Sequence, residues 1–151
     1  MKRDLDFDDP IAERVIRGKG CTIVVQLGRP RPEPAAGHIG WYCPYRIKGI
    51  PGKPDLQMFG GGEDAVEAII TALANIGSGL NYREKEQLGL DWGGIEHLGF
   101  LDTHKLPWMK PTPEEDRASE AILDVWSNPT STPEERQAII DTFIQEQFPQ
   151  E

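Results

Sequence analysis

Four side chains in one short stretch are of the types that bind metal ions. The cluster that combines carboxylates with imidazoles consists of Glu96, His97, Asp102 and His104. Their spacing matches no standard zinc arrangement, and a structural zinc site takes four ordered ligands. We therefore predict no metal and no cofactor, and two surface histidines in a solvated segment. A small enzyme or metal-binding domain that uses His97, Asp102 and His104 stays open as an alternative.

Two cysteines could supply a nucleophile or a disulfide. Cys43 falls on the inward phase of a predicted strand, where a cysteine behaves as a small apolar residue. A reactive thiol needs an electropositive and partly exposed setting instead. Cys21 falls on the same face of a neighbouring predicted strand, so a disulfide between the two is a geometric alternative. Two reduced core thiols are the favoured interpretation for a cytosolic chain.

Three consecutive glycines, Gly60 to Gly62, precede a predicted helix, as in phosphate-binding loops. The run lacks the Lys-Ser/Thr pair of a Walker motif and the spacing of a dinucleotide fingerprint. Glu63 and Asp64 follow directly and would repel a phosphate. We interpret the run as a flexible hinge at the start of a helix, and we predict no catalytic residues in the chain.

The charge of the chain indicates what kind of partner it binds. Lys and Arg number 16 and Asp and Glu number 25, so the net charge is −9. Residues 106–151 hold 3 basic and 10 acidic side chains, a balance of −7, whereas residues 1–105 hold 13 and 15, a balance of −2. Nucleic acids and anionic membranes attract basic surfaces, so neither is an expected partner. A basic protein is an expected partner, because complementary charge speeds association.

The predicted contacts with such a partner come from three places. They are acidic residues of the tail, arginines of a proline-rich segment and one tryptophan, a residue type enriched at interaction hot spots. These six residues are Glu120, Asp124, Asp141, Arg29, Arg31 and Trp126.

These residues must be positioned by a small mixed fold. The stretch from Trp41 to Gly49 alternates like a half-buried strand, with its large apolar side chains on one face. That inward face consists of Trp41, Cys43, Tyr45 and Ile47. Residues 28–37 contain three alternating prolines and are predicted to be an exposed loop, not a strand. The predicted strands are 11–17, at an edge, then 21–27, 39–48 and 55–59, which form a four-stranded antiparallel meander.

A helix over residues 63–76 is predicted to cover this sheet and to end at Gly77. Its apolar stripe is predicted to be Val66, Ile69, Ile70, Leu73 and Ile76. A sheet covered by one helix is a two-layer α+β arrangement. Beyond it, residues 82–87 are predicted to extend the helix after a kink, and residues 95–101 to form a fifth strand or an irregular segment.

Two nearly duplicate segments close the chain. Thr112-Pro-Glu-Glu115 and Thr132-Pro-Glu-Glu135 each have the pattern of a capping box, and helical periodicity follows each. We predict an αα-hairpin from residues 112–126 and 132–148. The predicted division is an α+β domain at 1–105, and a linker with an acidic helical hairpin, packed on that domain, at 106–151.

No stretch of the sequence is apolar and long enough for a membrane span. Residues 1–10 are polar and acidic, lack the apolar core of a signal peptide and are predicted to be a loose lead-in. We therefore predict a cytoplasmic protein.

The central strand resembles that of a small bacterial family of domains of unknown function. That family has a Trp-x-Cys-Pro-aromatic-x-Ile-x-Gly strand, preceded by Gly-Arg-Pro and followed by a helix that opens near Gly-x-Asp-Ala. The matching segments here are Gly28–Pro30, Trp41–Gly49 and Gly62–Ala65. The resemblance covers about residues 10–80 and implies no catalytic residues. In its small size and acidity the chain also resembles immunity and antitoxin-like proteins of bacterial competition systems.

These observations lead us to expect a non-enzymatic acidic binding protein. Its partner would be a basic protein such as a bacterial toxin, which it would occlude. Besides the metal-dependent alternative, a structural module whose sheet edge pairs with itself in a homodimer stays open.

Overall fold

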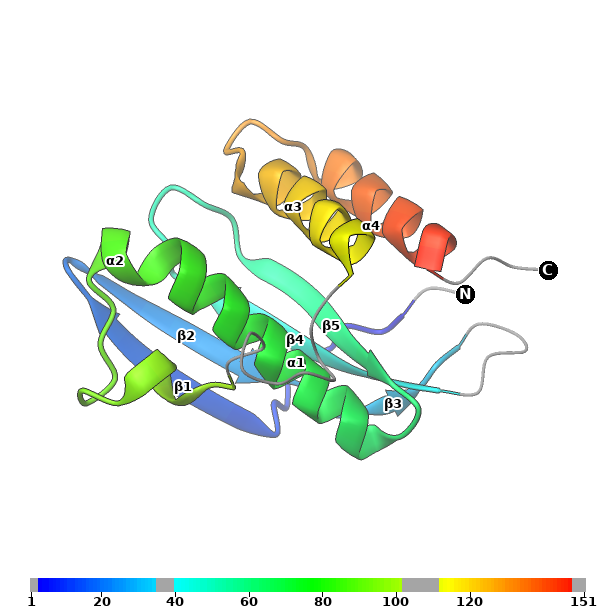
Figure 1. Cartoon of the computed structure of the whole chain (residues 1–151), viewed down its shortest axis with the longest axis horizontal. Coiled ribbons are helices and arrows are strands. Elements are labelled where there is room, and N and C mark those ends of the chain that lie inside the picture. Colours follow the sequence, from blue (N-terminus) through cyan, green and yellow to red (C-terminus); the bar gives the residue numbers. More distant parts are fainter. Residues whose placement is uncertain (1–2, 35–39, 102–111, 148–151) are drawn as a thin grey trace.

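The computed structural model describes residues 3–34, 40–101 and 112–147. One antiparallel sheet is covered by a long helix on one face, and a helical hairpin lies alongside (Figure 1). The predicted α+β class is thus confirmed. The strands are β1 (Ala12–Gly18), β2 (Cys21–Leu27), β3 (Arg31–Pro32), β4 (Trp41–Lys48) and β5 (Leu56–Gly62).

Strand β4 is the centre of the sheet, as predicted. It pairs with β5 along one edge, and with β2 and then β3 along the other. The inward residues Cys43, Tyr45 and Ile47 are at most 5% exposed. The period-two pattern therefore predicted the strand and its phase correctly, and β1 lies at the edge where its charges had placed it.

The prediction of a strand-free proline segment is wrong at β3. Arg31 and Pro32 pair with Tyr42 and Trp41. Gly28 N donates to the Pro44 carbonyl at 2.7 Å, so the chain stays beside β4 after β2 ends. A proline is tolerated here because β3 is an edge strand. Its missing N–H leaves no hydrogen bond to a second neighbouring strand unmade.

The predicted hinge at Gly60–Gly62 is also wrong, because these glycines are the last residues of β5. Gly60 and Gly62 pair with Cys43 and Trp41, so they lie on the helix-facing side of the sheet. A Cβ on Gly60 would collide with the backbone nitrogen of Ala72. The glycines therefore serve the close approach of helix and strand and not flexibility.

The covering helix α1 (Ala65–Gly79) begins two residues after the predicted start at residue 63 and continues past Gly77. The Asp64 side chain caps it by accepting from Glu67 N at 2.8 Å. Gly77 is buried, and a Cβ there would lie 2.6 Å from the Phe100 Cβ, so this glycine permits packing and does not end the helix. A π-helix, η1 (Leu80–Glu84), and α2 (Lys85–Leu88) follow. They agree with the prediction that residues 82–87 extend the helix.

The predicted apolar stripe of α1 is only partly the buried face. Val66 is 64% exposed and Ile70 is 39% exposed, whereas Ala68 and Ala72 are fully buried. Small residues on both elements bring the helix close to β5, and this rotates the bulky Val66 and Ile70 outward. The sequence pattern ranks residues by apolar size, so it missed this contact between alanines and glycines.

Residues 95–101 are irregular, which was one of the two predicted options. They contain a short 3₁₀ turn, η2 (Glu96–Gly99), in which His97 and Leu98 have positive φ angles of 53° and 55°. The Leu98 side chain is 1% exposed, so its burial in the core holds this unfavourable backbone conformation.

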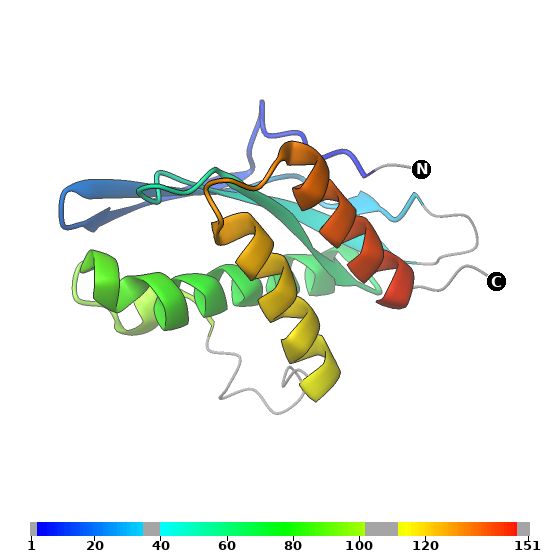
Figure 2. The same ribbon diagram turned by 90° about the horizontal axis from the view of Figure 1, so that it is seen from above.

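The N-terminal segment is not the predicted loose lead-in. Residues 3–10 cross the face of the sheet opposite α1 (Figure 2). Phe7 is 7% exposed, and the Arg46 guanidinium lies 4.8 Å from its ring centroid. Asp4 N donates to the Tyr42 hydroxyl at 3.0 Å. As a result Tyr42 is 3% exposed, and β4 is covered on both faces and not half-buried.

The predicted αα-hairpin is confirmed as α3 (Pro113–Ser127) and α4 (Pro133–Gln147). Its second capping box is present, since Glu135 N donates to Thr132 Oγ1 and Thr132 N donates to the Glu135 carboxylate. The hairpin lies beside β5 (Figures 1 and 2). The proposed division at residue 105 falls outside the described residues. Among the described helices, none combines the length and apolarity that a membrane crossing needs.

Candidate functional site

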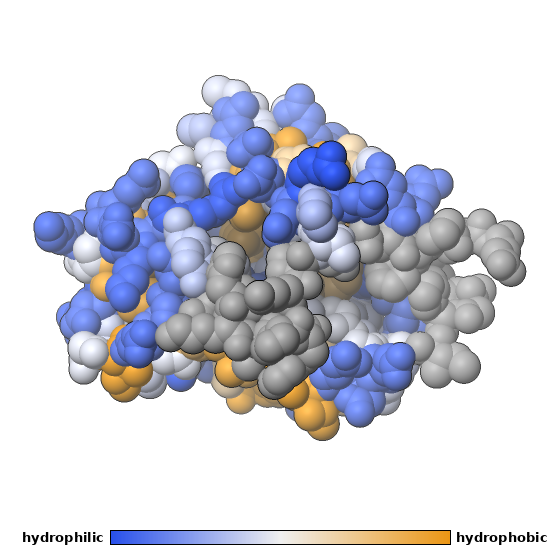
Figure 3. All heavy atoms as spheres, in the orientation of Figure 1, coloured by the Kyte–Doolittle hydropathy of each residue, from blue (hydrophilic) through white to orange (hydrophobic). Residues whose placement is uncertain are grey.

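The hairpin carries an uncompensated acidic surface. Every described carboxylate of α3 and α4 is exposed to solvent, and none of them forms an ion pair within the described part of the chain. Figure 3 shows mostly hydrophilic residues over the hairpin, at the top of the view. These residues, which we call the acidic surface, are Glu114, Asp116, Glu120, Asp124, Glu134, Glu135, Asp141 and Glu146.

The two arginines of the hairpin do not neutralise this surface. Arg117 Nε donates to the Pro113 carbonyl at 3.1 Å, and Arg136 donates to the Ser131 hydroxyl and carbonyl. Both guanidiniums are therefore used in local contacts with uncharged groups. The predicted contact residues Glu120, Asp124 and Asp141 remain available to a partner.

Within the acidic surface, α3 carries three carboxylates on one face. Asp116, Glu120 and Asp124 are spaced four residues apart, so neighbours in the series stand one turn apart. Like charges at this spacing destabilise a helix by about 0.2–0.5 kcal/mol per pair. The repulsion within this series opposes helix formation, and a cationic partner would relieve it.

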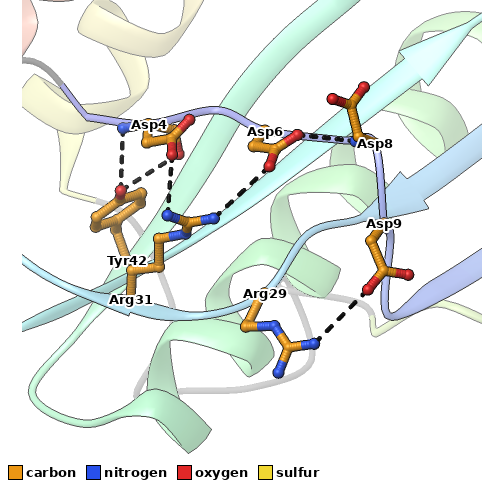
Figure 4. A network of polar contacts seen from close by, with 7 residues as sticks. All are labelled: Asp4, Asp6, Asp8, Asp9, Arg29, Arg31 and Tyr42. Carbon is orange, nitrogen blue, oxygen red and sulfur yellow. Dashed lines mark hydrogen bonds and ion pairs between the residues drawn. The ribbon is translucent and has the colours of Figure 1, made fainter.

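The predicted arginine contacts lie in a different place and are already paired. Arg31 donates to Asp4 at 2.9 Å and lies 3.9 Å from Asp6 (Figure 4). Arg29 lies 3.9 Å from Asp9. The acidic N-terminal segment therefore neutralises these arginines, and they do not join the acidic surface of the hairpin.

The predicted anchor Trp126 is partly buried near the end of α3. Its ring lies 5.8 Å from the guanidinium of Arg136 on α4. Its Nε1 is buried and has no hydrogen-bond partner among the described residues. Trp126 thus packs against the other helix of the hairpin and does not project as an exposed anchor.

The candidate metal ligands are described only in part. Asp102 and His104 lie outside the described residues. His97 is paired with Glu96, whose Oε1 lies 3.2 Å from the imidazole Nε2. Among the described residues, no three His, Cys, Asp or Glu side chains gather where they could hold a metal ion. The metal-dependent alternative therefore gains no support from this geometry.

The cysteines are free and far apart, so the alternative of a disulfide is wrong. In the β2–β4 register Val24 pairs with Lys48 and Leu27 with Tyr45, which places Cys21 and Cys43 toward opposite ends of the ladder. Cys43 is fully buried, and this burial raises the pKa of its thiol to about 11. A thiol of this kind is a poor nucleophile near neutral pH.

The homodimer alternative needs a sheet edge that is open to a second copy, and β1 is one of the edge strands. Asp91 N donates to the Arg17 carbonyl at 2.9 Å and occupies part of that edge. Edge pairing with a second copy stays a prediction for the remaining residues of β1.

One hollow was not predicted from the sequence. It lies where the β4–β5 turn, η1 and the end of α3 meet, and Gly79, Arg83 and Trp126 are among its lining residues. These segments are distant in sequence and share no motif. The local sequence signal for this hollow is Gly79 in a helix, with Arg83 one turn later.

The fold and the acidic surface define an α+β domain with an appended acidic hairpin. The family described as "Domain of unknown function (DUF6968)" matches residues 12–101, more than half of the chain, and the chain belongs to this family. The match runs from β1 to the end of the η2 region and leaves out the hairpin. No curated protein and no solved structure matches the chain. The expected membership in a domain family of unknown function is confirmed.

Proposed function

We propose that the chain is a non-enzymatic binding protein that covers a basic protein partner, as an immunity protein occludes a toxin. The observation that carries this proposal is the series Asp116, Glu120 and Asp124 on α3, exposed and without ion pairs in the described structure. Opposite charges at this spacing stabilise a helix, whereas like charges destabilise it. An arrangement that breaks a local rule without a compensating contact is expected at a functional site.

The rest of the molecule supports the same surface as the place of binding. The balance of −7 in residues 106–151 concentrates negative charge on the hairpin. By contrast, the carboxylates of Asp4 and Asp6 in the N-terminal segment face arginines of their own chain. A partner with a positive surface would therefore be steered to α3 and α4. The arginines Arg29 and Arg31 are secondary candidates in this proposal.

The proposal is tested by charge reversal on the hairpin. A variant with Glu120→Lys, Asp124→Lys and Asp141→Lys should no longer capture the basic protein that the wild type retains from the source cells. The matched control reverses three exposed carboxylates elsewhere, Asp8, Glu63 and Glu86. It has the same net charge and should still capture the partner.

The kinetics of the purified pair sharpen the test. Charge steering is screened over about 10 Å at 0.1 M salt, so association should slow as salt rises. The hairpin variant should lower the association rate much more than it raises the dissociation rate. A partner whose association rate ignores both salt and the hairpin reversals would refute the proposal.

A further inference from the structure

The sheet face opposite α1 holds residues 3–10 in the way that a surface holds a peptide ligand. The segment crosses that face (Figure 2) and contains no strand, so no backbone ladder fixes it there. The hydrogen bonds and ion pairs described between segment and sheet each involve a side chain. For example, Asp4 N donates to the Tyr42 hydroxyl at 3.0 Å. The contacts are therefore those of peptide recognition and not those of strand pairing.

The charges of the segment and the sheet are complementary. Residues 4–9 contain four aspartates. Arg31 donates to Asp4 at 2.9 Å and lies 3.9 Å from Asp6 (Figure 4). Arg29 lies 3.9 Å from Asp9. Although the chain as a whole is acidic, this face presents cations to what lies on it, and such a face suits a ligand with carboxylates.

Phe7 is the apolar anchor of the segment. It is buried, and the Arg46 guanidinium lies 4.8 Å from its ring centroid. Leu5, two residues earlier, is half-buried, whereas Asp4 and Asp6 are exposed. The segment thus has an apolar side, which lies on the sheet, and an acidic side, which meets the arginines. The pattern that this face receives is an aromatic residue between carboxylates.

The side chains that receive the segment are held in place by the domain itself. Arg46 donates to Gln26 Oε1 at 2.9 and 2.6 Å, and Gln26 Nε2 donates to the Glu13 carboxylate at 2.8 Å. The rings of Tyr42 and Phe59 meet edge to face, with their centroids 6.1 Å apart. These contacts do not involve the segment. The receiving face is therefore preorganised, and preorganisation lowers the cost of binding a ligand.

The ion pairs that hold the segment can open at little cost. The side chains of Asp4 and Asp9 are 58% and 93% exposed, and ion pairs at such exposure contribute little to stability. The pair of Arg3 with Glu33, at 2.7 Å, is less exposed, but both charges regain water when it opens. The family match, residues 12–101, includes the receiving face and leaves the segment out. The segment can therefore open locally while the sheet stays folded.

From these observations we propose that the sheet face opposite α1 binds an acidic, phenylalanine-containing peptide of a partner protein, and that residues 3–10 compete with it for the same place. The carboxylates of the peptide pair with Arg29 and Arg31, and its aromatic ring lies against Arg46. This face is separate from the acidic surface of the hairpin and takes a partner group of opposite charge. Either proposal can therefore fail without the other.

The experiment is a titration of the full chain with a free peptide that copies residues 3–10, followed by the backbone amide resonances of Tyr42 and Arg46 in ¹H–¹⁵N spectra. Because the segment competes, the apparent affinity falls with the fraction of open molecules. Phe7→Ala removes the anchor of the segment and should bind the peptide at least about tenfold more tightly than the wild type. The wild type should still bind it saturably below about 10 mM. Asp8→Ala, an exposed neighbour of the anchor, should bind as the wild type does.

The role of charge is tested in the Phe7→Ala background. Arg31→Gln should weaken binding about threefold to tenfold, and a peptide with Asn in place of Asp4 and Asp6 should lose a similar factor. The two changes together should lose little more than either alone, because they remove the same contact. A peptide with Glu in place of every Asp should bind within about tenfold of the parent peptide, since the class of ligand is acidic. Arg17→Gln removes an exposed cation of β1 that lies outside these contacts, and should change nothing.

Four results would overturn the proposal. They are no saturable binding to the wild type, no tighter binding to Phe7→Ala, unchanged binding of the Asn peptide, and no binding of the Glu peptide. A wild-type dimer that Phe7→Ala converts to a monomer in light scattering would overturn it as well, because the segment would then be received by a second copy. Should Phe7→Ala fail to fold, Asp4→Asn combined with Asp6→Asn takes its place. That variant removes only exposed ion pairs and should bind the peptide about threefold more tightly or better.

Discussion

The thiol of Cys43 is a buried acid whose environment favours its neutral form. Its pKa is raised by burial from an ordinary value of 9.0 to about 11. A group whose pKa is higher in the folded state stabilises the fold below the ordinary value, and that contribution is lost as pH rises through the higher one. Two pKa units correspond to about 3 kcal/mol. Burial raises the pKa of Tyr45 as well, so its contribution is lost in the same direction at higher pH.

We therefore expect the free energy of unfolding to fall between about pH 9 and pH 11, and the fall to be smaller in Cys43→Ala by up to about 3 kcal/mol. Urea unfolding of both proteins across this range measures the difference. If wild type and variant lose stability in parallel, the Cys43 thiol is not the group responsible.

Gly60 and Gly61 are neighbours in β5 with opposite roles, and they form a matched pair. In Gly60→Ala the new methyl group would meet the backbone of α1, with Ala72 Cα at 2.7 Å and the Ala68 carbonyl at 2.8 Å. Such overpacking should cost about 1–3 kcal/mol. In Gly61→Ala nothing lies within 4 Å, so stability should change by less than about 0.5 kcal/mol. Denaturant midpoints compare the two, and equal losses would contradict the close approach of α1.

At the scale of elements, the N-terminal segment is a structural part of the sheet. Phe7 is buried below Arg46, whose guanidinium also holds the Gln26 side chain at 2.6 Å. Phe7→Ala should therefore destabilise the fold by about 3 kcal/mol, as a buried aromatic does. Its neighbour Asp8 is exposed, so Asp8→Ala is the control and should be nearly neutral. If thermal unfolding shows that Phe7→Ala lowers the free energy of unfolding by less than about 0.5 kcal/mol, the N-terminal segment is a loose lead-in after all.

At the scale of the whole molecule, the acidic surface implies a conflict between stability and binding. Glu120→Lys would place a cation between Asp116 and Asp124, at the spacing where opposite charges stabilise a helix. The hairpin should gain about 0.5 kcal/mol, whereas association with the basic partner should slow.

Calorimetry of the free chain and association kinetics measure these two effects. Glu120→Gln, which removes the repulsion without adding a cation, should fall between wild type and Glu120→Lys in both measurements. Loss of stability together with loss of binding would mean that the carboxylates are structural and not reserved for a partner.

Local patterns in the sequence determined much of the architecture. The alternation from Trp41 to Ile47 predicted the central strand and its inward face, because burial on one side of a pleated strand has a period of two. The Thr132 capping box predicted the start of α4, because its hydrogen bonds are made within one turn. The acidic surface was also predictable, since charged side chains of an amphipathic helix face solvent.

Contacts between distant segments were decided by the tertiary structure alone. The sequence predicts a hinge at Gly60, but the contact with Ala72 makes this glycine a packing position. It predicts a loose segment around Phe7, but the contact with Arg46 fixes that segment on the sheet. The hollow that includes Gly79 and Trp126 exists only because α3 returns to the end of α1. A local pattern predicts which residues are buried. It does not predict which backbone segment packs closely against a glycine or which segment covers a face of the sheet. Those outcomes depend on packing across the whole chain.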